Sequence, residues 1–107
     1  MGNDTKVLNA IGMCRRAGKL AVGMDATAES IGRGAWLVLI AKDASDRSRR
    51  KVTEAASGIT EIAELRYTKD EIESAVGRRF AVAAVKDKNL AQAVRNALQK
   101  EDKINAD

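Results

Sequence analysis

Two continuous apolar runs constrain this chain more than any other feature of its sequence. The first, WLVLIA, covers residues 36–41, and the second, FAVAAV, covers residues 80–85. Neither run alternates apolar with polar residues, as a strand with one solvated face would. We therefore predict two strands that are buried on both faces, in a sheet covered by helices on each side.

The rest of the sequence predicts two further strands and five helices in alternation, which is typical of an α/β sandwich with a mixed sheet. Ser45 is an expected N-cap, and Thr68 with Glu71 forms a T-x-x-E capping box. Glycine follows most of the helices, as expected at their ends. The short strands are expected at 20–22 and 63–67, and the helices at about 5–16, 25–33, 46–57, 69–76 and from about 88 onward.

Length and composition indicate one domain covering residues 1–107, with a polar, frayed tail at about 102–107. Hydrophobic residues make up 45% and charged residues 32%, a profile typical of folded soluble proteins. No apolar run approaches the 18 or so residues that a membrane span needs. The N-terminal residues carry no apolar signal core, and a single cysteine suits a reducing compartment. We expect a cytoplasmic protein.

The sequence argues against catalysis. It contains no histidine, which removes the commonest general base and most zinc sites. Cys14 falls on the apolar stripe of the first helix, where it is expected to act as a buried small hydrophobe. The aromatic residues are Trp36, Tyr67 and Phe80 alone, so base stacking on several rings is not expected. We predict no enzyme activity, no metal and no cofactor.

A net charge of +4 and a pI near 9.5 favour polyanionic partners. One basic run, SDRSRRK at 45–51, has two interpretations. It is either a solvated helix face, with Arg50 and Glu54 paired at i,i+4, or a secondary phosphate patch. The patch would consist of Arg47, Arg49, Arg50 and Lys51.

Two further positions could contact phosphate. Gly23 opens a helix close to Lys19, and a helix N-terminus presents backbone N–H groups to anions. The spacing of a Walker loop or a dinucleotide fingerprint is missing there. Arg78 and Arg79 lie on a loop before the second buried run, where they are either phosphate ligands or ordinary turn residues.

The motifs together resemble the ribosomal-protein family that binds kink-turns in RNA, and most of all its small bacterial YlxQ-type members. The resemblance covers nearly the whole chain. It implies a three-layer α/β/α sandwich with a four-stranded mixed sheet, and RNA as the partner. It rests on the segments RRAGKLAVG, RG with the following buried strand and AKDAS, RYTKDEIESAVG, and AVAAVKDKNLAQAV.

The family's binding helix begins G-x-N-E-x-x-K, and this chain matches that pattern only in part. Gly23 matches the glycine, whereas Asp25 replaces the asparagine, Ala26 the glutamate and Glu29 the lysine. An ionised aspartate only accepts hydrogen bonds, and Glu29 places a negative charge where a phosphate-facing lysine would stand. The RNA-binding set implied by the resemblance is Lys19, Gly23, Met24, Asp25, Ala26, Glu29, Arg33, Lys42, Arg78, Arg79, Phe80, Ala81 and Val82.

The sequence thus yields a hypothesis of a non-catalytic RNA-binding protein, working with the ribosome or with structured RNA such as ribosomal RNA. The departures at Asp25, Ala26 and Glu29 leave specific kink-turn recognition open. The alternative is a protein-interaction module that keeps the fold and has lost the RNA surface.

Overall fold

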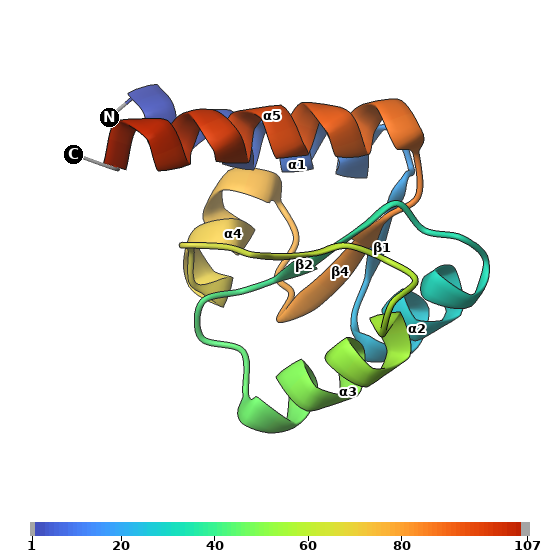
Figure 1. The fold of residues 1–107 in the computed structure, drawn as a ribbon. Coiled ribbons are helices and arrows are strands. Elements are labelled where there is room, and N and C mark those ends of the chain that lie inside the picture. Colours follow the sequence, from blue (N-terminus) through green and yellow to red (C-terminus); the bar gives the residue numbers. More distant parts are fainter. Residues whose placement is uncertain (1, 106–107) are drawn as a thin grey trace.

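The two apolar runs form the centre of a four-stranded sheet in the computed structural model, which describes residues 2–105 (Figure 1). Strands β2 (Leu37–Ile40) and β4 (Val82–Val85) pair antiparallel, and every residue of both is buried. Strand β1 (Leu20–Val22) pairs antiparallel with β4, and β3 (Ile62–Glu64) pairs parallel with β2. The order β1-β4-β2-β3 makes β1 and β3 the edges of a mixed sheet, as predicted.

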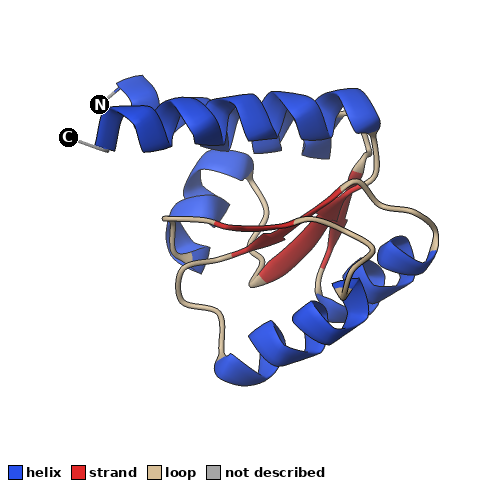
Figure 2. Cartoon of the chain, viewed as in Figure 1, coloured by secondary structure: helices blue, strands red, loops and turns tan. Residues whose placement is uncertain are grey.

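Five helices lie on both faces of this sheet, which confirms the α/β/α sandwich (Figure 2). Their bounds differ from the expected ones by a few residues at most. None of the helices within residues 2–105 combines the length and apolar character needed to cross a membrane. The helices are α1 (Gly2–Arg16), α2 (Met24–Gly32), α3 (Asp46–Ala56), α4 (Lys69–Val76) and α5 (Lys88–Asn105).

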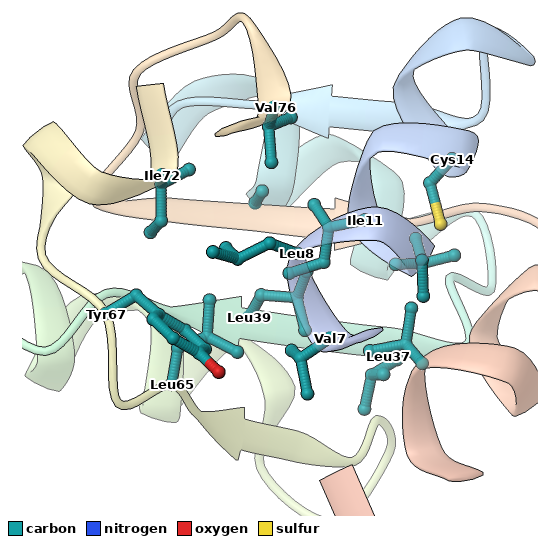
Figure 3. Packing of buried hydrophobic residues seen from close by; sticks show 14 of the residues in the cluster. Val7, Leu8, Ile11, Cys14, Leu37, Leu39, Leu65, Tyr67, Ile72 and Val76 are labelled. Carbon is teal, nitrogen blue, oxygen red and sulfur yellow. The ribbon is translucent and has the colours of Figure 1, made fainter. Parts of the chain in front are cut away.

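Alternate residues of β2 supply the two cores. Leu37 and Leu39 pack against α1, α4 and α5, and Figure 3 shows side chains of α1 and α4 in this larger core. Val38 and Ile40 face the smaller core under α2 and α3, which holds Val52 of α3. Because successive side chains of a strand point to opposite faces, a continuous apolar run is what such a central strand requires.

The strand expected at 63–67 is shorter than predicted, since it ends at Glu64. Beyond that residue the chain leaves the sheet and turns into α4. Tyr67 is buried beneath α5, where its hydroxyl donates a hydrogen bond to the Glu101 carboxylate. The apolar Leu65 and the aromatic Tyr67 are buried in this connection as they would be in a strand, so the residue types alone do not distinguish the two.

The C-terminal helix extends further than the sequence indicated. Glu101, expected to be among the polar end residues, is only 2% exposed, and its Oε1 lies 3.8 Å from Arg66 Nε. The backbone of residues 102–105 continues α5, while residues 106–107 of the expected frayed tail lie outside the described part of the chain.

Both predicted N-caps are present. Ser45 Oγ accepts a hydrogen bond from the backbone N–H of Ser48 at 3.1 Å. Thr68 Oγ1 accepts one from the Glu71 N–H at 3.2 Å, and Glu71 Oε1 accepts one from the Thr68 N–H at 2.8 Å, which completes the capping box. The box fixes the start of α4, and Gly77 in its left-handed conformation ends the helix.

We predict that Thr68→Ala lowers the free energy of unfolding by about 1 kcal/mol, because one N–H of the first turn loses its acceptor. Thr68→Ser keeps the acceptor and should cost less than half as much. Urea denaturation followed by circular dichroism measures both. Equal losses for the two variants would show that the threonine acts through packing and not through its cap.

Candidate nucleic-acid interface

Three chain segments meet at the end of the sheet where β1 and β2 finish and β4 begins, here called the Gly23 end. The Gly23 N–H donates a hydrogen bond to the Val82 carbonyl at 3.0 Å. The Ala41 N–H donates to the Ala81 carbonyl at 2.8 Å, so the exposed Lys42 follows directly. The start of α2, the loop before β4 and the loop after β2 therefore share one end of the molecule.

The N-terminus of α2 opens at this end. Gly23 occupies the N-cap with φ 98° and ψ 164°, and no side chain caps the helix. The first hydrogen bond of the helix runs from the Thr27 N–H to the Gly23 carbonyl at 2.9 Å, which leaves the N–H groups of residues 24–26 without helical acceptors. Asp25 is exposed in this first turn, while Met24 and Ala26 are half-buried. The helix end thus has anion-binding potential, which the carboxylate of Asp25 partly offsets.

A groove runs along the free edge of β1 and has a volume of about 650 Å³. The last turn of α1, strand β1 and one face of α2 form its walls. Its charged lining consists of four basic side chains and one carboxylate, namely Arg15, Arg16, Arg78, Lys86 and Glu29. The groove is therefore strongly positive. Henceforth it is called the β1 groove.

Two contacts draw these basic groups together. The Arg15 guanidinium reaches the loop before β4, where its Nη1 lies 3.4 Å from the point that a Cβ on Gly77 would occupy. At the other end of β1 the Lys86 N–H donates to the Lys19 carbonyl at 2.8 Å, which places two exposed lysines side by side. Arg15 thus lies beside the loop that carries Arg78, and Lys19 lies beside Lys86.

Ion pairing separates the basic residues into two groups. Arg33 Nη2 lies 3.6 Å from Glu29 Oε2, and Arg79 pairs with Asp70 and also, at 3.8 Å, with Glu73. The hydrogen bond to Asp70 raises the pKa of Arg79 further above its ordinary value. Among the described residues, no ion pair involves Arg15, Arg16, Lys19, Arg78 or Lys86. Their charge remains available to an anionic partner.

The structure gathers part of the expected RNA-binding set and separates the rest. Gly23, Met24, Asp25, Lys42 and Ala81 share the Gly23 end, and Ala26, Glu29 and Arg78 line the β1 groove. Lys19 directly precedes β1, and Arg33 directly follows α2; both lie at the opposite end of the sheet. Phe80 and Val82 are 3% and 2% exposed. Their side chains therefore belong to the two cores and leave only backbone for contact with a ligand.

Sequence reasoning missed Arg15, Arg16 and Lys86 as interface residues. Arg15 and Arg16 lie off the apolar stripe of α1, in its last turn, and Lys86 directly follows a buried strand. These positions in the sequence predict that the three side chains are exposed, but they do not predict that the side chains lie close together. They meet only because β1 and β4 pair antiparallel between α1 and α2.

The four basic residues of the run on α3 differ in their contacts. Arg49 is committed to the fold, because its guanidinium pairs with Glu64 and donates to the Lys42 carbonyl at 2.9 Å. Arg47, Arg50 and Lys51 are exposed. Within the described residues, no ion pair joins Arg50 to Glu54.

Cys14 has the environment of a structural thiol. It is fully buried on α1 in the larger core (Figure 3), and burial raises the pKa of its thiol to about 11. A group with that pKa carries almost no thiolate at neutral pH. No cluster of three or more acidic, cysteine or histidine side chains suited to a metal occurs among the described residues.

Comparison with known proteins agrees with this architecture. No protein-family model matches the chain. The sequence is 29% identical over 99 residues to the RNA-binding protein YlxQ of Enterococcus faecium. The alignment covers 92% of this chain and 96% of that protein. The resemblance to a YlxQ-type protein, indicated by the sequence motifs, is confirmed.

Two solved structures share the fold. A protein of unknown function from Bacillus halodurans superposes with a TM-score of 0.81 at 18% identity, covering 89% of this chain and 98% of that one. The 15.5kD RNA binding protein of Giardia lamblia gives a TM-score of 0.63 at 19% identity, covering 94% of this chain and 88% of that one. At these identities the likeness establishes the α/β/α architecture.

We predict that Gly23→Ala destabilises the protein by about 1–3 kcal/mol, because its φ and ψ fall in a region open almost only to glycine. Steric overlap is not the cause of the expected loss, since a Cβ at Gly23 would meet nothing within 4 Å. Gly32→Ala is the matched control, since Gly32 is helical with equally open space, and it should be neutral or slightly stabilising. Thermal melting compares the two; equal melting temperatures would contradict the role of φ.

Proposed function

We propose that this chain is a non-catalytic RNA-binding protein of the cytoplasm that contacts structured RNA, including ribosomal RNA, through the β1 groove and the Gly23 end. The observation that carries the proposal is the grouping of ion-pair-free basic side chains in that groove, beside the N-terminus of α2. RNA phosphates would be neutralised there without breaking internal ion pairs. Such contacts supply affinity and position the ligand, and they read no sequence.

The names of similar proteins support RNA as the partner. The Enterococcus faecium relative, aligned over most of both chains, and the structural neighbour from Giardia lamblia are both named RNA-binding proteins. The chemistry of this chain is compatible with that role. The buried Cys14 thiol has no histidine to act as its base, and RNA binding of this kind needs no metal or cofactor.

Within this function, preference for kink-turns over other structured RNA depends on the first two turns of α2. The exposed Asp25 adds a negative charge at the helix N-terminus, where it competes with phosphate for the same positive end. Glu29 lines the β1 groove and pairs with Arg33, so it offsets one basic group and adds repulsion. We propose that the chain binds structured RNA with little preference for kink-turns.

A protein-interaction module of the same fold is the second candidate. Asp25 and Glu29 favour it, since both place carboxylates on the helix that would face RNA. The four basic groups of the groove weigh against it, because an acidic protein partner would be required to match them.

We predict that the double change Arg15→Ala and Arg16→Ala weakens RNA binding by about tenfold or more at moderate salt. It should also reduce the slope of log affinity against log salt by about two, because two phosphate contacts are lost. Filter binding to a ribosomal RNA fragment across a salt series measures both quantities. The control is Arg47→Ala with Arg50→Ala, which removes the same charge from exposed positions on α3.

Equal losses for the two double variants would show that net charge alone governs binding and that the β1 groove is not the site. No binding by the wild-type protein at low salt would exclude the RNA function itself. An acidic protein bound through the same arginines would then favour the interaction module.

A second prediction concerns kink-turn specificity. The triple change Asp25→Asn, Ala26→Glu and Glu29→Lys restores the family pattern and should raise affinity for a kink-turn RNA by more than about tenfold, on the scale of one or two specific base contacts. Affinity for a straight duplex should rise much less. Glu54→Lys on α3 makes the same net change in charge and controls for it.

If the wild-type protein already binds the kink-turn tightly and selectively, Asp25 and Glu29 are not obstacles. If the triple variant and Glu54→Lys gain equally on both RNAs, restored side-chain recognition is excluded and only charge has changed.

A further inference from the structure

A single exposed aromatic ring lies at the end of the sheet opposite Gly23. Trp36 is 43% exposed, and it is the only tryptophan in the chain. Its backbone is held on both sides, because its N–H donates to the Val85 carbonyl at 3.0 Å and its carbonyl accepts a bond from Arg95 Nη2 at 2.8 Å. The ring is therefore presented from a fixed position at the start of β2.

Basic groups surround this ring. Lys88 Nζ stands 5.6 Å from the ring centroid, within the range of a cation–π contact. Lys86 and Lys19, joined by their backbones, lie at the same end of the sheet because Trp36 and Lys86 flank the pair Leu37 and Val85. No ion pair among the described residues involves any of these lysines.

The acidic groups at this end have other partners. Asp87 accepts a hydrogen bond from the Leu90 N–H at 2.9 Å at the start of α5. Glu61 Oε1 accepts one from Arg95 Nε at 2.5 Å, and Glu29 pairs with Arg33. Each of these carboxylates thus has a partner of its own, whereas the three lysines have no ion pair among the described residues.

The ring lies at the end of the sheet that also carries Lys86, a residue of the β1 groove. A smaller hollow of about 80 Å³ is lined by Ser30, Arg33, Gly34, Ala35 and Lys86. It shares Ser30 and Lys86 with the β1 groove and ends at the residue before Trp36. Lys86 is thus common to the groove, to this hollow and to the end of the sheet that carries the tryptophan.

We propose that Trp36 is a stacking platform for one unpaired base of an RNA strand that leaves the β1 groove, with Lys86 and Lys88 on its phosphates. The inference rests on the proposed RNA-binding function and adds a single-stranded element to it. Base stacking on an aromatic ring is tolerant of sequence because every base has a π-face. One ring serves one nucleotide, in keeping with the small number of aromatics in the chain.

Tryptophan fluorescence tests the proposal directly, because Trp36 is the sole source of the signal. The probes are one RNA stem-loop with and without a short single-stranded tail, on the 3′ and then the 5′ side. We expect one tailed RNA to quench the fluorescence and to bind about tenfold more tightly than the blunt RNA. The blunt RNA should bind with little quenching.

Two substitutions separate stacking from apolar burial. Trp36→Phe keeps a ring and should retain much of the gain from the tail, whereas Trp36→Leu should abolish that gain and leave affinity for the blunt RNA unchanged. Thermal melting of both variants checks the fold. A variant that melts much earlier is replaced by Lys88→Ala, a change beside the ring and outside the β1 groove, which should also reduce the gain from the tail.

The outcomes distinguish this inference from the proposed function. Blunt and tailed RNAs that bind equally well without quenching would overturn the stacking role while RNA binding stands. Failure of every RNA to bind at low salt would remove the proposed function and this inference with it. Retention of the tail gain by Trp36→Leu would show that phosphate contacts alone produce it, and would also overturn the stacking role.

Discussion

The antiparallel pairing of β4 with both of its neighbours is the constraint on which the rest of the structure depends. Because β4 runs opposite to β1 and β2, its first residue lies beside their last residues, and its last residue beside their first. The start of α2 and the loops around Lys42 and Ala81 are thereby gathered at one end of the sheet. Lys19, Trp36 and Lys86 are gathered at the other.

The same pairing leaves β1 as a free edge strand between α1 and α2. An exposed edge is usually a liability, since it can pair with another chain. Here the strand has only three residues, and Arg15, Arg16 and Lys86 flank it. Like charge discourages the pairing of two such edges, and it attracts a polyanion to the groove.

Ion pairing separates the basic residues into those that stabilise local structure and those whose charge stays unpaired. Arg49 on α3 and Arg79 in the loop after α4 are paired with Glu64 and Asp70 and stabilise local geometry. Along the β1 groove the arginines have no such partners among the described residues, and Glu29 is directed to Arg33. Basic side chains without an ion pair among the described residues therefore lie both in the β1 groove and on the exposed face of α3, at Arg47, Arg50 and Lys51.

The sequence by itself determined the elements, because each depends on a local pattern. Continuous apolar runs produced central strands, Ser45 and Thr68 produced caps, and Gly77 in its left-handed conformation ended α4. It could not determine which exposed basic residues meet, since Arg15 is far along the chain from Arg78 and Lys86. Nor could it show that Glu101 is buried. The burial of Phe80 and Val82 follows from the apolar run at 80–85, although the family resemblance placed both in the RNA-binding set. The meeting of the basic residues and the burial of Glu101 depend on strand order and helix packing, which are long-range contacts that no local pattern encodes.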